Sequence, residues 1–424
     1  MPLQEDERGV MGAPIDETGF DFEPEVSGVD VPPIITGADP VSPRIAGSLR
    51  AYLESRRARL ASVSASPPRM VVLTRLGDTV HAHLVAQPMG ARTQVTFGAE
   101  PVQQAAFDPT NWEQLVYRSD TAGTEDFQIF QVNIATRAMT RISDGKSRSG
   151  PFRLAPKGQL IAYSTNQRSP ADMDIVVSEL AAPRTIRLSV PREGQHVPLA
   201  WSKDGARLAI QHYVSKTSSG LYLLALGSSS AELIEAPRDG VAYIAAAFTP
   251  DDRSLYVLRT RSGDFMEAHR YELAKKTWTP LTSDLGWDVE EMALSGDGRW
   301  LVLNVNQDGY SRLFKLDTKT LQRKAAGNIP AGVVSGMRFM GKGLTLAFSL
   351  NQATEPTDAY TFDLVAEKLT RWTHSETGGI PRSRFVEPEI DSLRILRRYP
   401  NTGLRLSLAR RRTFPDVALD ARWP

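Results

Sequence analysis

The sequence contains no cysteine, carries a formal net charge of only +1, and has no long apolar run. Without cysteine the chain can form no disulfide, no thiolate metal site and no thiol nucleophile. A balanced charge gives no overall attraction to nucleic acid or to an anionic membrane. The first residues, MPLQEDERGVMGAPIDETG, are acidic where a secretory signal would be basic and then apolar. These absences predict a cytoplasmic protein with no membrane or nucleic-acid partner and no cofactor.

Residues with catalytic chemistry are also sparse. The six histidines are dispersed, and only His81 and His83 share one strand face, at a spacing that would suit two metal ligands. With no third ligand close in sequence, packing between strands is the competing interpretation. No G-x-S-x-G motif is complete, since the nearest string, GSSSA (residues 227–231), ends in alanine and reads as a loop between strands. We therefore assign no catalytic residue and no metal ligand.

The two ends of the chain differ from its middle. Residues 1–41 are rich in proline, glycine and acid, which predicts a disordered acidic N-terminus. Apolar residues at helical spacing then predict a helix over residues 42–66, which Pro67 and Pro68 end. Residues 385–424 read as an extended linker followed by an irregular, arginine-rich tail. That tail has little aromatic interleaving, which argues against the alternative that it binds nucleic acid.

The middle of the chain repeats itself. A bulky apolar residue, a turn such as Lys203-Asp204-Gly205, and an apolar strand recur at intervals of 45 to 47 residues. The apolar residues that open these units are Phe107, Leu154, Trp201, Phe248, Leu294 and Phe339.

Each repeat has room for four short strands, which is typical of a propeller blade. Most units show a second strand pair after the first, as in GLYLLALGSSSAELIEA. Residues 69–96 hold three such strands and count as a partial blade, so the sequence predicts an all-β, seven-bladed β-propeller over residues 68–384. We expect the missing strand to come from elsewhere in the chain and to close the ring. A β-sandwich, or two stacked β domains, is the alternative.

The openings LSGDGRWLVL and WSKDGARLAI resemble TolB-like and WD-type propeller repeats. Longer stretches resemble the propeller of the prolyl oligopeptidase family of serine peptidases, in its acylaminoacyl-peptidase and dipeptidyl-peptidase-like branch. These stretches are ARTQVTFGAEPV, ISDGKSRSG, GWDVEEMALSGDGRWLVLNVNQDGYSRLFKLD, IPAGVVSGMRF, KLTRWTHSETGG and FVEPEI, which span residues 91–390 in order.

The resemblance implies that the propeller limits which peptides reach a catalytic domain. In that family an α/β-hydrolase domain with a Ser, Asp and His triad follows the propeller. FVEPEI (residues 385–390) resembles the junction with that domain, and the residues after it do not resemble its start. We therefore expect the hydrolase domain to be missing through truncation or frameshift, and this chain to be inactive in peptide hydrolysis by itself.

Three carboxylates at the opening of the sixth blade are the candidate substrate residues. Asp288, Glu290 and Glu291 follow Trp287 and could bind a peptide amine near the channel. The alternative is that they are solvated or cap the blade. A second hypothesis for the whole chain is a stand-alone propeller that binds a peptide or protein partner through its faces or channel, because loops vary freely on a rigid ring.

Overall fold

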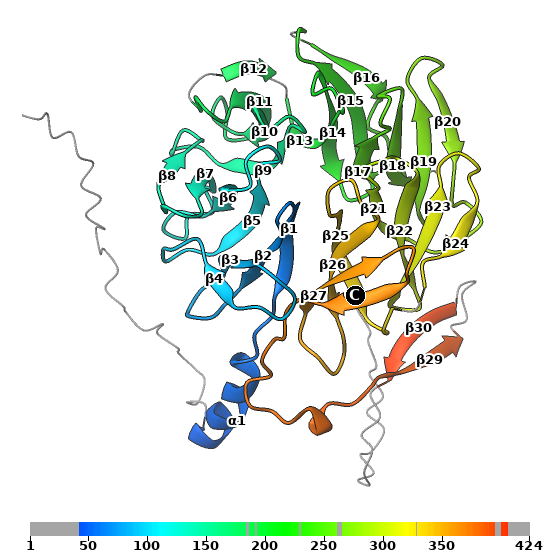
Figure 1. Cartoon of the computed structure of the whole chain (residues 1–424). Coiled ribbons are helices and arrows are strands. Elements are labelled where there is room, and N and C mark those ends of the chain that lie inside the picture. The colour runs from blue at the N-terminus through cyan, green and yellow to red at the C-terminus, as the bar shows by residue number, and fades with distance from the viewer. Residues whose placement is uncertain are drawn as a thin grey trace, which may run out of the picture. The chain divides into compact units, whose positions relative to one another are not determined.

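Seven four-stranded antiparallel sheets form a ring in the computed structural model (Figure 1). The structure describes residues 42–183, 186–190, 193–228, 230–260, 265–327, 329–394 and 400–405. The predicted disordered N-terminus, residues 1–41, and the last part of the predicted irregular tail lie outside these residues. The seven-bladed propeller predicted from the repeats is confirmed. No helix within the described ranges is long and apolar enough to cross a membrane.

Every blade uses its four strands in chain order, from the innermost strand outward. Blade 1 contains β1 (Arg59–Ala65), β2 (Pro68–Thr74), β3 (His81–Val85) and β4 (Arg92–Gln94). Blade 2 contains β5 (Val102–Phe107), β6 (Gln114–Ser119), β7 (Gln128–Asn133) and β8 (Met139–Arg141). Blade 3 contains β9 (Ser149–Leu154), β10 (Leu160–Thr165), β11 (Asp174–Glu179) and β12 (Ile186–Val190). Blade 4 contains β13 (Gln195–Trp201), β14 (Arg207–Ser215), β15 (Ser218–Ala225) and β16 (Ala231–Glu235).

The other blades follow the same plan. Blade 5 contains β17 (Tyr243–Phe248), β18 (Ser254–Thr260), β19 (Met266–Glu272) and β20 (Thr277–Pro280). Blade 6 contains β21 (Val289–Leu294), β22 (Trp300–Gln307), β23 (Tyr310–Asp317) and β24 (Arg323–Ala325). Blade 7 contains β25 (Val333–Phe339), β26 (Thr345–Asn351), β27 (Asp358–Asp363) and β28 (Lys368–Arg371).

The repeated turn between the first two strands of a blade is held by a hydroxyl and a carboxylate. In blade 4 the Ser202 hydroxyl donates to Asp204 Oδ1 at 2.6 Å and accepts from the Arg207 amide at 2.8 Å. The hydroxyl thus ties both sides of the turn together, which explains why Ser or Thr precedes Asp by two residues in several repeats. The same arrangement occurs at Thr249, Asp251 and Ser254 in blade 5 and at Ser295, Asp297 and Trp300 in blade 6.

The helix predicted over residues 42–66 is wrong in its second half. Helix α1 spans Pro43–Leu53, and Arg59–Ala65 forms strand β1, which pairs with β2. This segment supplies the strand that the partial blade lacked, from directly before it in sequence. Pro67 and Pro68 end no helix but lie at the hairpin between β1 and β2, where backbone pairing outweighs the weak helical pattern.

The ring closes by packing between blade 7 and blade 1 rather than by exchange of a strand. Leu60, Met70 and Val72 of blade 1 share a buried apolar cluster with residues of blade 7. On the side of blade 7 the cluster contains Ala347 and Ala359 of its strands, Met340, which follows β25, and Trp372, which follows β28. Burial of apolar surface therefore joins the two blades, together with a backbone hydrogen bond from the Ala58 amide to the Thr357 carbonyl at 2.8 Å.

The chain begins and ends its ring at the same face. Because antiparallel strands alternate in direction, the start of β1 and the end of β28 lie on one side, which we call the exit face. The Arg56 amide donates to the Glu376 carbonyl at 3.0 Å on this side. After a 3-10 turn at Arg382–Arg384, strands β29 (Glu389–Arg394) and β30 (Pro400–Arg405) form an antiparallel pair. The prediction of an irregular tail is therefore wrong for these residues.

Candidate functional site

The inner edge of the ring is the part of the fold where a ligand would meet backbone groups. Each innermost strand is the edge of its sheet, and edge strands leave backbone groups without a partner in the sheet. Some of these groups are satisfied by a side chain of the preceding blade. Gln104 Nε2 donates to the Phe152 carbonyl at 2.9 Å, and its Oε1 accepts from the Phe152 amide at 3.1 Å. The side-chain amide thus links blades 2 and 3 as an additional strand residue would.

Glu291, one of the three predicted substrate residues, makes the corresponding link between blades 6 and 7. Its two carboxylate oxygens accept hydrogen bonds from the Gly336 amide at 2.8 Å and the Met337 amide at 3.1 Å. Gly336 has a φ of 69°, and the register of β25 shifts here, which turns both amides toward the carboxylate. Successive amides that converge in this way favour an anion. Glu291 provides that anion from within the chain.

Asp288 and Glu290 contact other parts of the ring. Asp288 Oδ1 accepts a hydrogen bond from the Met266 amide at 2.7 Å, at the start of β19. Glu290 Oε1 accepts from Asn306 Nδ2 at 2.8 Å, and its side chain is exposed. The three carboxylates thus have three different partners, on β19, β22 and β25. The role of these residues in holding a peptide amine stays a prediction.

Three arginines of the inner strands were not identified from the sequence. Arg59 of β1 donates from Nη2 to the Gln103 carbonyl at 2.9 Å. Arg153 of β9 donates from Nε to the Leu199 carbonyl at 2.9 Å and from Nη1 to the Phe152 carbonyl at 3.0 Å. Arg338 of β25 is exposed and has neither a hydrogen bond nor an ion pair with the residues that the structure describes. The inner edge therefore carries one cation without a fixed partner beside two that are anchored.

The charge of Arg338 interacts with the charges of both Arg59 and Arg153. Burial, and after it the charge of Arg338, lower the pKa of Arg153 to about 10. Burial of its charged group at the inner edge also lowers the pKa of Arg338; the charge of Glu291 opposes this shift, and the charge of Arg59 adds to it. Burial and neighbouring Arg57 lower the pKa of Arg59. Excess positive charge is thus gathered where blades 1, 3 and 7 face one another.

An alignment of the repeats would have revealed two of these arginines. Arg153 and Arg338 each stand one position before the apolar residue that opens their repeat. The same position holds alanine in the other complete repeats, at Ala106, Ala200, Ala247 and Ala293. Because alanine suffices at this position in four repeats, the fold does not require the large cationic side chains of Arg153 and Arg338.

The segment after the last blade is held against the exit face. Arg382 Nη1 donates to Glu355 Oε1 at 2.5 Å, and Arg382 Nη2 donates to His374 Nε2 at 2.8 Å. Further along, the Thr354 hydroxyl donates to Glu387 Oε1 at 3.0 Å. The residues that precede and include the FVEPEI stretch therefore follow a defined path along blade 7.

His81 and His83 have structural partners. His81 Nε2 bonds to the Gly98 carbonyl at 3.1 Å, and His83 Nδ1 bonds to the His81 carbonyl at 3.0 Å. Burial lowers the pKa of both imidazoles. In the part of the chain that the structure describes, no group of three or more acidic or histidine side chains is placed to hold a metal ion.

The GSSSA string lies in a hairpin, as predicted. Gly227 and Ser228 follow β15, and Ala231 begins β16. A nucleophile elbow requires a turn from a strand into a helix, and here a strand follows instead.

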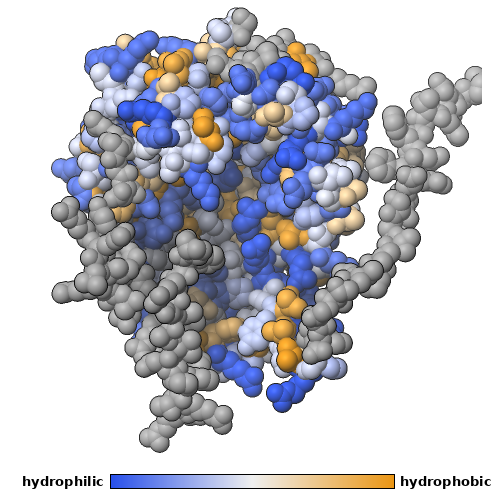
Figure 2. All heavy atoms as spheres, turned by 180° about the vertical axis from the view of Figure 1, so that it is seen from behind, coloured by the Kyte–Doolittle hydropathy of each residue, from blue (hydrophilic) through white to orange (hydrophobic). Residues whose placement is uncertain are grey.

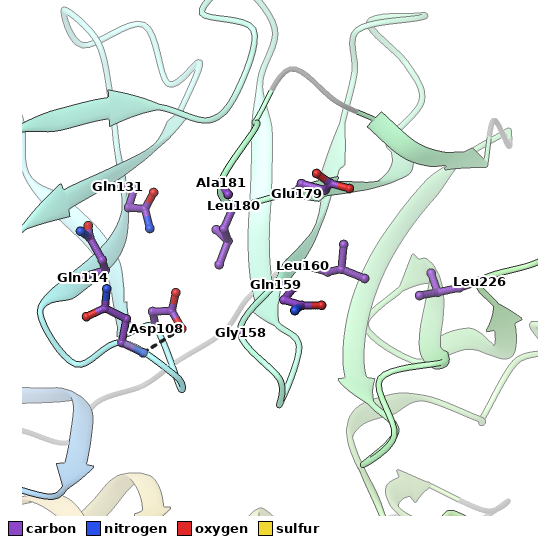
Figure 3. Close-up of a pocket in the computed structure, with 11 residues that line it drawn as sticks. Asp108, Gln114, Gln131, Gly158, Gln159, Leu160, Glu179, Leu180, Ala181 and Leu226 are labelled. Carbon is purple, nitrogen blue, oxygen red and sulfur yellow. Dashed lines mark hydrogen bonds between the residues drawn. The ribbon is translucent and has the colours of Figure 1, made fainter.

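A pocket with a volume of about 960 Å³ lies between blades 2 and 3 (Figure 3). Gln114 and Gln131 of blade 2 lie on one side of it, while Gln159 and Leu180 of blade 3 lie on the other, with Leu226 beyond. Its lining comes from the loops after the first and third strands of the blades and from the adjoining strand ends, which lie on the side of the ring opposite the exit face. Amide groups and a few leucines, together with the carboxylates of Asp108 and Glu179, suit a polar chain such as a peptide.

Comparisons with known proteins bear on the fold. No family model matches the sequence, and no curated protein sequence matches it. Two solved structures match with TM-scores of 0.66 and 0.65. The first comes from a structural and mechanistic study of two prolyl endopeptidases, with 12% identity over 82% of this chain and 54% of that chain.

The second is a puromycin-hydrolyzing peptidase of Mycobacterium tuberculosis, with 15% identity over 84% of this chain and 58% of that chain. This chain thus spans little more than half the length of either peptidase. At such low identity the match concerns the fold. The described part of the chain is a seven-bladed propeller whose fold matches the propeller region of prolyl oligopeptidase-type peptidases.

Proposed function

We propose that this propeller screens peptides for a serine peptidase domain of the α/β-hydrolase type. The observation that carries the proposal is the match over 82% and 84% of this chain to two longer peptidases, of which it covers 54% and 58%. The exit face supports it, because the chain enters and leaves the ring on one side. A domain that followed Ile390 would start beside the opening of the ring.

The docked exit segment gives this arrangement a physical basis. Arg382 and Glu387 hold the segment to the loop that contains Thr354 and Glu355. A junction fixed at two points would limit how far a following domain moves from the ring. Residues 385–390 serve as that junction, and the inner edge of the ring serves as the passage that excludes folded proteins.

Peptide binding by the purified chain tests the screening function. We expect a short, unstructured, fluorescently labelled peptide to bind, as measured by fluorescence anisotropy. The same peptide displayed in a loop of a folded carrier protein should not bind, because the carrier cannot enter the ring. Equal affinity for both forms would exclude a size filter.

Two further experiments test the proposal that a catalytic hydrolase domain is missing from this chain. The chain by itself should not turn over a fluorogenic peptide or ester, and turnover that a serine-directed phosphonate abolishes would contradict this. Sequencing beyond the coding region should find a hydrolase reading frame. Co-expression of that frame should restore hydrolysis, whereas absence of the frame would argue against a separated catalytic half.

The pocket between blades 2 and 3 favours a second function, a propeller that binds a peptide or protein partner for its own sake. It lies on the side away from the exit face and would stay open to solvent when a hydrolase domain is attached. Gln131→Ala should weaken capture of a specific partner if this pocket is the binding site. Under the screening function the same substitution should leave short-peptide binding at the inner edge unchanged.

A further inference from the structure

The arginines of the inner strands are candidates for ligand binding, because the fold of the ring does not require a cation at their positions. β1 contacts both β5 and β25, so Arg59 and Arg338 lie on neighbouring inner strands, while Arg153 stands on β9. Arg59 and Arg153 are anchored on backbone carbonyls. Figure 2, which views the molecule from behind, shows a hollow near the middle of that face.

Arg338 is the group available to a ligand. The residue as a whole is exposed, and its side chain has no hydrogen bond or ion pair within the described ranges. The nearest acidic group that acts on it is Glu291, whose two oxygens already accept the amides of Gly336 and Met337. Arginine presents several N–H donors in a planar fork that matches a carboxylate. The free fork of Arg338 therefore lacks the partner that its chemistry suits.

The anchored arginines would strengthen binding of an anion at Arg338. Arg153 donates hydrogen bonds from Nε and Nη1, which leaves Nη2 for a ligand. Charges gathered inside a protein wall are screened less by water and salt than charges on an open surface. A negative group beside Arg338 would relieve the repulsion between Arg338 and the other two arginines as well as form hydrogen bonds.

We propose that Arg338, supported by Arg59 and Arg153, forms a carboxylate-binding site at the inner edge of the ring, where it selects peptides that carry a negative charge. That the anion is part of a peptide rests on the screening function proposed above. Two sources offer the same chemistry, namely the C-terminal carboxylate of a peptide and the side chain of an internal Asp or Glu.

A comparison of three labelled peptides distinguishes the two sources of the carboxylate. Fluorescently labelled hexapeptides of Ala and Pro would be compared with a free C-terminus, with an amidated C-terminus, and with an amidated C-terminus plus one internal Glu. The free and the Glu-containing forms should each bind about 10- to 100-fold more tightly than the neutral amide, a range typical of a charge-assisted hydrogen bond. A gain in only one form assigns the site to that source, and equal affinity for all three overturns the proposal.

Substitution of Arg338 tests whether this residue causes the preference for charged peptides. Arg338→Ala should remove the difference between the charged and neutral peptides, while Arg338→Lys should keep part of it. The matched control is Arg312→Ala, an exposed arginine of β23 on the third strand from the centre. Since Arg338 makes no hydrogen bond, the melting temperature should not change. Selectivity retained in Arg338→Ala would overturn the proposal.

A chemical readout separates this site from the screening function. Phenylglyoxal modifies accessible arginines, and citrate should protect Arg338 but not Arg312, as measured by mass spectrometry. Protection of Arg338 without any peptide binding would refute the screening function and leave the carboxylate site. Peptide binding that is independent of charge, with no protection by citrate, would refute the site and leave the screening function.

Discussion

The Ser349 hydroxyl accepts a hydrogen bond from the Leu60 backbone amide at 2.8 Å, across the boundary between the last blade and the first. Both residues are buried, with exposed fractions of 0% and 2%. Leu60 lies in β1, the strand that completes blade 1, and 289 positions separate the two residues in sequence. Together with the apolar cluster around Trp372, this bond joins the two ends of the ring.

Removal of that hydroxyl should destabilise the whole ring. We expect Ser349→Ala to lower the free energy of unfolding by about 1–3 kcal/mol, because the Leu60 amide would stay buried without an acceptor. Urea unfolding would measure the change. Ser149→Ala is the matched control, since Ser149 is 1% exposed and its hydroxyl has no hydrogen-bond partner. Equal losses in both variants would show that the bond does not contribute.

Glu291 should act in stability rather than in ligand binding. Glu291→Ala leaves two amides without their acceptor and should cost about 2–3 kcal/mol, while Glu291→Gln keeps one carbonyl oxygen and should cost less. Glu290→Ala removes one exposed contact and should change stability by less than about 0.5 kcal/mol. Thermal melts of the three variants would test this order. Unchanged stability of Glu291→Ala, with weaker binding of peptides that have a free N-terminal amine, would assign the residue to the ligand instead.

The turn aspartates should make stability depend on acid pH. The Ser295 hydroxyl, then the Arg299 amide, lower the pKa of Asp297 below its usual 3.8. Hydrogen bonds from Ser202 and Ala206 do the same for Asp204, and Thr249 does so for Asp251. A carboxyl with a lowered folded-state pKa stabilises the protein above its unfolded pKa, and this contribution is lost as the pH falls through the folded value.

Thermal melts between pH 7 and pH 2.5 should therefore show a loss of stability that begins below about pH 4. A variant with Asp204→Asn, Asp251→Asn and Asp297→Asn should be less stable at pH 7 and should lose less between pH 4 and pH 2.5. The same acid slope in this variant and in the unmodified chain would assign the slope to other carboxyl groups.

The exit segment should detach without unfolding the ring. Arg382→Ala removes the bonds to Glu355 and His374, and exposed pairs of this kind contribute only about 0.2–1 kcal/mol each. The melting temperature should hardly change, while limited proteolysis near residues 376–388 should become faster. Arg384→Ala, an exposed neighbour in the same turn, is the control. Equal cleavage rates in both variants would show that Arg382 does not fix the segment.

The architecture could be predicted because the repeats carry local signals. Ser or Thr two positions before Asp, then an apolar strand, encodes a hairpin that forms within about ten residues. Residues 59–65 were misassigned because Leu60 and the apolar residues before it also fit helical spacing. Pairing with β2 and contact with blade 7 decide the structure of these residues, and a helical pattern does not contain that information.

The candidate site could be predicted only in part. Asp288, Glu290 and Glu291 stand together in sequence, yet their hydrogen bonds lead to three different strands. Side chains of an inner strand reach the neighbouring blade, so adjacent positions do not share a partner. Arg59, Arg153 and Arg338 lie far apart in the chain and meet only in the ring.

The sequence by itself determined the number of blades, the hairpin turns and the absence of thiol chemistry, because each depends on residues close together or on composition. The tertiary structure decided which strand completes blade 1, how Ser349 and Leu60 close the ring, and which charges face one another at its inner edge. Those features depend on contacts between blades, which form only when the blades assemble into the ring and the last blade packs against the first.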